Sequence, residues 1–162
     1  MIIDNFLSPN EFEYIKNIIL DFDDCQFPWY YQPTVSHIDS DDSHYFTHSF
    51  FSLERNQKSN YFQILYPILN KIKINQLIRA KANLFLKESD NLIIHDSHID
   101  YPYEHSGCIF YLNTNDGYTI LSDGTKIESI ENRILFFNPY LHHSSTTCTN
   151  SKFRSNINFN YT

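Results

Sequence analysis

The sequence predicts a mainly β fold, an antiparallel barrel or jelly roll with flanking N-terminal helices packed on one sheet. Three observations predict it. Apolar residues follow a helical spacing only in the first 75 of the 162 residues. A two-residue alternation begins after Asn75, and short apolar runs separated by turn residues then continue to about residue 161. The length fits one domain over 1–162, with a helical and irregular support over 1–75 and a jelly-roll core over about 76–162.

The first helix is predicted over about 9–22. Ser8 is a capping residue, Pro9 suits the first helical position, and Glu11 stands where a capping box has its acid. The apolar face of this helix has helical spacing and consists of Phe12, Ile15, Ile18, Ile19 and Phe22. Leu7 is expected to pack against Phe12 as a hydrophobic staple at the start of the helix.

A second helix is predicted over about 58–73. Its apolar residues with helical spacing are Tyr61, Phe62, Leu65, Leu69 and Ile72. Pro67 is expected to kink or split it. The intervening residues 23–57 are aromatic and irregular. Their aromatic run at 27–31 is interpreted as core, with a substrate cleft as the alternative.

The strands begin after Asn75. One face of the first strand is expected to carry Ile78, Ala80, Ala82, Leu84 and Leu86, and the other Arg79, Lys81, Asn83 and Phe85. Further short apolar runs lie at 92–94, 108–112, 118–121 and 133–137, and a last strand is predicted over about 153–161. Turn signals at 115–117 and 123–124 separate neighbouring strands, as in an antiparallel sheet.

The charge and the cysteines limit the classes of partner and compartment. Lysine and arginine total 12 against 19 acidic residues, a formal charge of −7, so duplex nucleic acid is not an expected partner. No apolar run approaches the ~20 residues of a membrane span, and the start of the chain lacks the features of a signal peptide. Cys25, Cys108 and Cys148 are odd in number and far apart, which favours a reducing compartment and a cytoplasmic location.

Five of the eight histidines lie between 95 and 143. Two histidines and one carboxylate can occupy one face of an octahedral metal and leave three positions open, which is typical of non-haem Fe(II) sites. His98 and Asp100 stand two apart and point to the same side if they lie on a strand. His143 is the candidate for a third ligand from a distant strand.

Two alternatives compete with this ligand set. His37-Ile38-Asp39 repeats the His-x-Asp tripeptide of His98 and Asp100, but in a loop-like stretch rich in Ser and Asp. His142 stands beside His143 and is the alternative for the third ligand.

The last predicted strand carries a row of polar side chains. One face of it holds Arg154, Asn156, Asn158 and Asn160, opposite Ile157, Phe159 and Tyr161. Such a row is either solvated or lines a polar pocket. An arginine in the row can bind a carboxylate through two hydrogen bonds.

These motifs together resemble the Fe(II)/2-oxoglutarate-dependent oxygenases, most of all their small phage-encoded and prolyl 4-hydroxylase-like branch. The family pattern of His-x-Asp, a distal His and a later Arg or Lys maps onto His98, Asp100, His143 and Arg154. The resemblance implies a double-stranded β-helix (jelly roll) with the first three as catalytic metal ligands. In the family the distal ligand follows Leu and one variable residue, which favours His143 over His142.

The resemblance also implies the cofactors, namely Fe(II), 2-oxoglutarate as cosubstrate and O2, with ascorbate as a candidate reductant. The distal carboxylate of 2-oxoglutarate is then expected to meet Arg154 and Tyr111, the latter in the apolar strand at 108–113. Asn83 and Asn156 are further candidate contacts. Relatives often carry Tyr where Phe85 stands, and a phenylalanine cannot donate the corresponding hydrogen bond.

The function implied is that of a dioxygenase that hydroxylates a C–H bond of a protein or peptide side chain, with proline as one candidate, and releases succinate and CO2. The alternatives are a hydroxylase of a small molecule or free amino acid, a nucleic-acid demethylase-like enzyme and a catalytically silent jelly-roll binding protein. Arg154-x-Asn156 resembles the terminal motif of the demethylase branch, but Asn160 replaces its second Arg. For a phage-encoded chain the expected location is the host cytoplasm.

Overall fold

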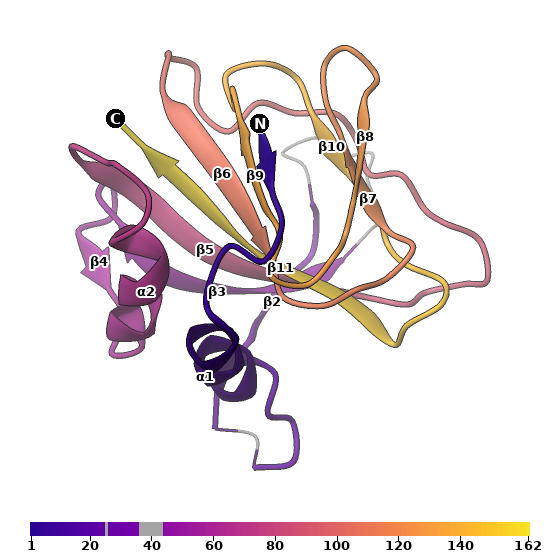
Figure 1. Cartoon of the computed structure of the whole chain (residues 1–162). Coiled ribbons are helices and arrows are strands. Elements are labelled where there is room, and N and C mark those ends of the chain that lie inside the picture. Colours follow the sequence, from indigo (N-terminus) through magenta and orange to yellow (C-terminus); the bar gives the residue numbers. More distant parts are fainter. Residues whose placement is uncertain (25, 36–43) are drawn as a thin grey trace.

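The structure, a computed structural model, describes residues 1–24, 26–35 and 44–162 (Figure 1). The strands of its larger sheet are β1 (Ile2–Ile3), β2 (Tyr30–Gln32), β3 (Tyr45–Ser52), β4 (Gln57–Lys58), β5 (Leu77–Leu86), β6 (Ser106–Tyr111), β9 (Ile134–Phe137) and β11 (Phe153–Tyr161). They run antiparallel in the order β1-β9-β6-β11-β5-β3-β2, with β4 beside β3. The smaller sheet has the order β10-β7-β8, from β7 (Tyr118–Ile120), β8 (Lys126–Glu128) and β10 (Ser144–Ser145). The chain is thus mainly β and antiparallel, which confirms the predicted jelly roll.

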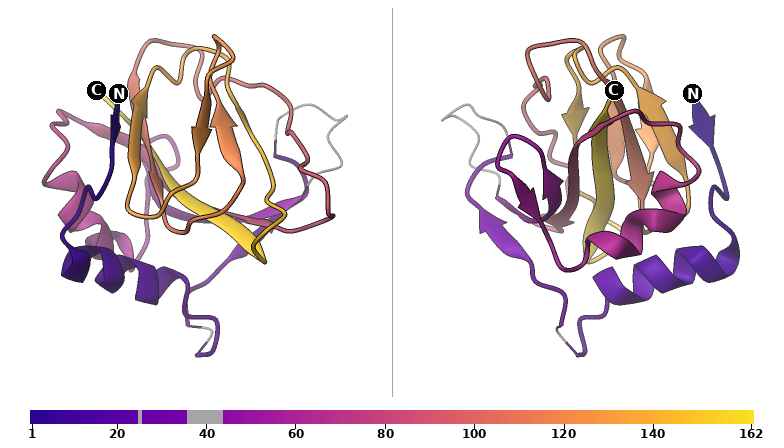
Figure 2. Two further views of the ribbon diagram at one scale, coloured as in Figure 1. Left: turned by 45° about the vertical axis from the view of Figure 1, so that its right-hand side comes forward. Right: turned by 90° about the vertical axis from the view of Figure 1, so that its left-hand side faces the viewer.

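The helices cover one face of the larger sheet, and the smaller sheet stands over the other (Figures 1 and 2). The helical layer consists of α1 (Pro9–Ile19), the 3₁₀ helix η1 (Phe62–Leu65) and α2 (Tyr66–Leu69). The main apolar core lies between this layer and the sheet, and it includes Phe12, Ile15, Ile19, Ile68, Ala80, Ala82, Phe110, Ile157 and Phe159. Burial of this apolar surface is the dominant stabilising contribution to such a fold. A smaller cluster, Ile109, Tyr111, Ile127 and Leu135, fills the space between the two sheets.

Strand β11 lies in the middle of the larger sheet. It pairs with β5 on one side and β6 on the other, so Asn156 stands opposite both Asn83 and Tyr111. Because side chains alternate along a strand, Ile157 and Phe159 enter the core under the helices. The polar row that begins at Arg154 faces the smaller sheet, as the sequence predicted for a pocket-lining strand.

The start of α1 confirms the predicted capping box, but the helix is shorter than predicted. The N–H of Ser8 donates to the Glu11 carboxylate at 3.0 Å, and its hydroxyl donates to the same oxygen at 2.7 Å. The helix ends at Ile19 rather than at residue 22. The carboxylate of Asp21 accepts hydrogen bonds from the two N–H groups at Asp23 and Asp24, and this turn competes with another helical turn.

The predicted second helix over 58–73 is wrong in length. In its place are the last residue of β4, then η1 and the four-residue α2. Pro67 lies in the first turn of α2, where its missing N–H would have no partner in any case. The segment is therefore split into η1 and α2, which is one of the two outcomes expected of this proline.

The irregular segment predicted at 23–57 contains strands. β3 is eight residues long, and most of its side chains are buried on both faces of the sheet. A strand covered on both sides lacks a clean alternation of polar and apolar residues. Conversely, the apolar run at 92–94 is not a strand, since it makes only an isolated bridge between Ile94 and Thr146.

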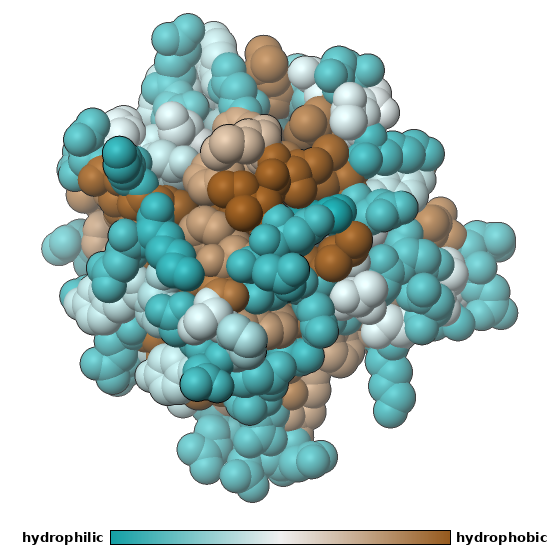
Figure 3. All heavy atoms as spheres, viewed as in Figure 1, coloured by the Kyte–Doolittle hydropathy of each residue, from teal (hydrophilic) through white to brown (hydrophobic). Residues whose placement is uncertain are grey.

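Most of the face in Figure 3 is hydrophilic, with one cluster of hydrophobic residues near the upper centre, where Figure 1 draws the edge strand β1. Ile2 and Ile3 of that strand are 43% and 39% exposed. Among the described residues, no helix has the length and apolar character needed to cross a membrane. Cys108 and Cys148 are buried and free.

Candidate metal centre

The structure brings His98, Asp100 and His143 together at one end of the polar row. One ligand atom of each lies within 4.8 Å of the others. His98 and His143 form an isolated antiparallel bridge, in which the N–H of each donates to the carbonyl of the other, at 3.0 and 2.9 Å. The N–H of Asp100 donates to Pro139 at 3.0 Å and extends this pairing. His98 and Asp100 therefore lie on a short bridged segment and not in a strand, yet their side chains meet at the same place.

The two imidazoles present lone pairs at the right positions for a metal. Nδ1 of His143 lies 3.0 Å from the carbonyl of Leu141, and Nδ1 of His98 lies 3.4 Å from that of Asp96. A carbonyl oxygen can only accept a hydrogen bond, so Nδ1 of each imidazole carries the proton. The unprotonated Nε2 of each imidazole is left to bind a metal. Burial, together with the neighbouring His143, lowers the pKa of His98 to about 4. His98 is thus neutral near pH 7, as metal binding requires.

The carboxylate of Asp100 is held on both oxygens. Arg79 Nη2 donates to Oδ1 at 2.7 Å, while Asn158 and Asn160 donate to Oδ2 at 3.1 and 2.8 Å. Burial alone would raise the pKa of Asp100, but Arg79, His143 and the two amides outweigh it and hold the pKa well below its usual range. The carboxylate of Asp100 is therefore ionised and fixed in orientation before a metal binds.

Arg154 lies at the other end of the polar row and is fully buried. Its Nε donates to Ser129 at 2.9 Å, its Nη2 to Thr119 at 3.0 Å and its Nη1 to the carbonyl of Thr146 at 3.4 Å. Within the described part of the chain no acidic group comes within ion-pair distance of it. Burial lowers the pKa of Arg154, because a buried charge without a counter-ion is unfavourable.

Tyr111 completes the surroundings of this guanidinium. Its hydroxyl lies 2.9 Å from Oγ1 of Thr119, the atom that Arg154 also contacts. The rings of Tyr111 and Phe85 lie 5.7 and 5.6 Å from the guanidinium carbon. Phe85, which cannot donate a hydrogen bond, therefore forms an aromatic wall beside Arg154.

One narrow cavity connects Arg154 with the three ligand candidates. Asn83 and Asn156 line it and are joined by a hydrogen bond of 2.9 Å. Two buried amide oxygens, Oδ1 of Asn83 and Oδ1 of Asn158, have no hydrogen-bond partner among the described residues. Buried polar atoms of this kind indicate a polar occupant. The hydrogen bonds of Arg154 to Ser129, Thr119 and Thr146 leave two of the five guanidinium N–H groups for a ligand, so a carboxylate fits this end and a divalent metal fits the other.

Comparison with known proteins places the fold. The sequence matches no protein-family model, and no curated protein matches it either. Solved structures do match. A prolyl hydroxylase from Trichoplax adhaerens, in complex with a peptide fragment of the hypoxia inducible factor oxygen degradation domain, has a TM-score of 0.65 at 13% identity and covers 99% of this chain and 82% of its own. The 2-oxoglutarate complex of a viral collagen prolyl hydroxylase from Paramecium Bursaria Chlorella virus-1 has a TM-score of 0.61 at 14% identity, with 99% and 93% covered.

The chain has the fold of the 2-oxoglutarate- and Fe(II)-dependent oxygenases. A non-haem α-ketoglutarate-dependent epimerase of nogalamycin biosynthesis shares this oxygenase fold, with a TM-score of 0.67 at 12% identity over 100% of this chain and 76% of its own. The expected family resemblance is thus confirmed at the level of the fold. Because hydroxylases and an epimerase share it, the reaction has to be inferred from the site.

The positions of the other histidines bear on the ligand alternatives that the sequence left open. His142 is exposed and contacts Ser97 at 3.4 Å, away from the cluster, whereas His143 joins it. The His37–Asp39 pair lies outside the described residues. His48 is used structurally, since its ring nitrogens lie 2.8 Å from the carbonyl of Pro28 and 2.8 Å from the hydroxyl of Ser59.

Sequence reasoning missed some contributors to the site. The sequence placed Arg79 only on one face of the strand after Asn75, and its role beside Asp100 depends on the pairing of β5 with β11. Thr119 and Ser129, which accept hydrogen bonds from Arg154, were not singled out. A buried threonine in the apolar run at 118–121 was the one available signal, because a polar residue in such a run needs a partner.

Proposed function

We propose that this chain is an Fe(II)- and 2-oxoglutarate-dependent oxygenase that hydroxylates a C–H bond of a protein or peptide side chain. The observation that carries the proposal is one cavity with two ends. His98, Asp100 and His143 lie at one end, and the buried Arg154, which has no acidic partner among the described residues, lies at the other. Bound iron and 2-oxoglutarate would supply the oxidation, in which O2 and 2-oxoglutarate convert the C–H bond to C–OH and release succinate and CO2.

The residues have distinct tasks in this proposal. His98, Asp100 and His143 would hold the metal on one face and leave its other positions to the cavity. Arg154 would neutralise and orient the distal carboxylate of 2-oxoglutarate, with Tyr111 as a second hydrogen-bond donor. The apolar cluster behind Tyr111 excludes water from that end of the cavity, which strengthens both interactions.

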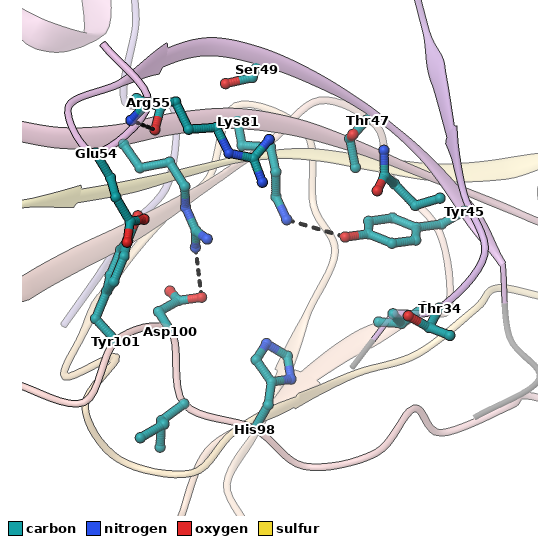
Figure 4. A pocket seen from close by; sticks show the side chains of 15 residues that line it. Thr34, Tyr45, Thr47, Ser49, Glu54, Arg55, Lys81, His98, Asp100 and Tyr101 are labelled. Atoms are coloured by element: carbon teal, nitrogen blue, oxygen red, sulfur yellow. Dashed lines mark hydrogen bonds and ion pairs between the residues drawn. The ribbon is translucent and has the colours of Figure 1, made fainter. Parts of the chain in front are cut away.

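The shape of the neighbouring surface supports an extended substrate. A cleft of about 310 Å³ opens beside His98 and Asp100 (Figure 4). A second hollow of about 560 Å³ continues from it, and the two share Gln32, Thr47, Ser49 and Arg55. Two adjoining hollows next to the candidate metal centre suit a peptide segment, which lays several residues along a surface. Proline is one candidate side chain.

The test is turnover. The purified chain is supplied with Fe(II), 2-oxoglutarate and O2, and succinate is measured with peptides, including proline-containing ones, and with free amino acids and other small molecules. We expect peptide-dependent succinate formation and a 16-dalton gain in the peptide, one oxygen atom, in the wild type. His98→Ala should abolish both signals and His142→Ala should retain them. Absence of metal binding and of 2-oxoglutarate turnover in the folded wild type would instead support a silent binding protein.

A further inference from the structure

The cleft beside the metal centre contains positive charge that no acid neutralises. Arg79 is paired with Asp100 at 2.7 Å. Lys81 and Arg55 also line the cleft, and within the described part of the chain no carboxylate lies within 4.0 Å of either. We propose that Lys81 and Arg55 form an anion-binding subsite and that the substrate carries a carboxylate. This inference rests on the proposed function and names its substrate class.

Lys81 is placed to reach a substrate near the metal. It lies on β5, on the same face as Arg79 and Asn83, and lines both the cleft and the narrow cavity. His98 and Asp100 line the same two cavities. An anion bound by Lys81 would therefore lie close to the reacting position.

Tyr45 fixes the ammonium group of Lys81. Lys81 Nζ donates to the Tyr45 hydroxyl at 3.2 Å. The ring of Tyr45 is buried and stacks on Phe85 at 5.2 Å with an interplanar angle of 7°, so the hydroxyl has a defined position. Because that hydroxyl accepts from Lys81, its own proton stays available to donate to a substrate oxygen. Lys81 and Tyr45 together present donors to one point in the cleft.

Arg55 supplies the second cation from the turn between β3 and β4. Its backbone N–H bonds to Ser52 at 3.3 Å, but its guanidinium has no hydrogen bond or ion pair in the described structure. In Figure 4 the side chains of Arg55 and Lys81 enter the cleft from above, and His98 and Asp100 border it from below. A substrate carboxylate between the two cations would leave the rest of the molecule facing the metal ligands.

The charge balance of the cleft favours an anion. Among the described residues, Glu54 is the one other acidic residue that lines the cleft, and the charges of Arg79 and Asp100 neutralise each other. Lys81 and Arg55 therefore exceed the remaining acid, and a bound divalent metal adds further positive charge. This local excess stands in a protein whose formal charge is −7. A cationic cleft in an acidic surface attracts anions to that place and repels them elsewhere.

The experiment compares acids with their neutral amides on the Mn(II)- and 2-oxoglutarate-loaded protein, in which binding is measured by calorimetry without turnover. One pair is a capped peptide with aspartate beside a proline and the same peptide with asparagine. The other pair is free glutamate and glutamine. We expect the acid to bind at least about tenfold more tightly than its amide in one pair, and the preferred pair identifies a peptide or a free-acid source.

Variants assign the preference to the subsite. Lys81→Gln and Arg55→Gln should each remove most of the tenfold preference, while Lys152→Gln, an exposed lysine elsewhere, should keep it. Affinity for 2-oxoglutarate should stay within about twofold of wild type in all three. No preference for the acid in either pair, including no binding of any probe, overturns the inference. So does a large loss of 2-oxoglutarate affinity in Lys81→Gln, which would assign this lysine to the cosubstrate. Failure of the wild type to bind 2-oxoglutarate would overturn the proposed function instead.

Discussion

Arg79 donates a hydrogen bond from Nη2 to Oδ1 of Asp100 at 2.7 Å, and through its Nε it also holds Asn160, which binds the other oxygen of the same carboxylate. The candidate metal ligand is thus neutralised by a protein cation before a metal arrives. A metal ion and Arg79 act on the same buried negative charge. Their contributions to stability should therefore be coupled.

Arg79→Gln should reveal this coupling. Without metal, the variant leaves the Asp100 carboxylate with amide partners only and should lose roughly 1–3 kcal/mol of unfolding free energy. Mn(II) replaces the missing positive charge, so the metal should raise the melting temperature more in Arg79→Gln than in the wild type. Thermal denaturation with and without Mn(II) measures both shifts. Arg133→Gln is the control, because it breaks an exposed Arg–Asp pair with Asp4. Equal metal-induced shifts in wild type and Arg79→Gln would contradict the coupling.

Metal binding should require His98, Asp100 and His143. Replacement of any one by Ala leaves two ligands and should weaken Mn(II) binding by at least about a hundredfold, by analogy with the loss of a ligand's supporting partner, which alone costs 10–100-fold. His142→Ala is the matched control, since it removes the exposed neighbour of His143. Calorimetric titration of the folded variants decides it. If His142→Ala lost metal binding and His143→Ala retained it, His142 would be the third ligand in place of His143.

Arg154 and Tyr111 should set the affinity for 2-oxoglutarate. Removal of a buried charged partner costs roughly 2–5 kcal/mol, so Arg154→Gln should weaken 2-oxoglutarate binding by about 1.5 to 3.5 orders of magnitude. Tyr111→Phe keeps the ring and should lose about tenfold or less. The measurement is 2-oxoglutarate titration of the Mn(II)-loaded protein. Metal affinity without cosubstrate serves as the internal control and should be unchanged. Unaltered 2-oxoglutarate affinity in Arg154→Gln would exclude this role.

Replacement of Gly117 should affect stability and 2-oxoglutarate binding, because this glycine lies against the side chain of Arg154. A Cβ at Gly117 would lie 2.6 Å from Cδ of Arg154 and 2.5 Å from the carbonyl oxygen of Thr147, so the arginine or the backbone has to move. Gly117→Ala is expected to lower both the melting temperature and the affinity for 2-oxoglutarate.

Gly124→Ala is the control that introduces backbone strain without displacing a neighbouring side chain. Gly124 has a φ of +83° and open space around its Cβ position, so Ala there costs about 1 kcal/mol of stability through the backbone alone. Its 2-oxoglutarate affinity should equal that of the wild type. If both glycine variants bind 2-oxoglutarate normally, the close contact with Arg154 does not control the pocket.

The sequence was informative where one local pattern decides the structure. The capping box at Ser8, the alternation around Arg79 to Phe85 and the polar row from Arg154 all follow from the spacing of neighbouring residues, and the fold agrees with them. The candidate ligands could be named because the family pattern is itself a spacing. Contacts between residues of distant strands could not be predicted from the spacing of neighbouring residues. The contact between Arg79 and Asp100, for example, requires knowing that β5, β11 and the segment after Ile94 converge.

Two errors have a common physical origin. The long helix predicted over 58–73 came from apolar spacing, but a proline at position 67 and packing against the sheet favour two short helical turns. The strand β3 was missed since burial on both faces removes the alternation that marks a strand. In both cases tertiary packing outweighs the local preference.

The central position of β11 has a consequence for how the chain folds. β11 separates β5 from β6, although it comes after both in the sequence. β5 also pairs with β3, and β6 with β9, but the facing edges of β5 and β6 gain a hydrogen-bonded partner only when the last strand inserts between them. Closing such long loops before any contact compensates for the lost entropy makes folding slow. We expect the sheet, the helical core and the ligand cluster to appear in one late kinetic phase, because β11 lies in the middle of the sheet, supplies Ile157 and Phe159 to the core and holds Asp100 through Asn158 and Asn160.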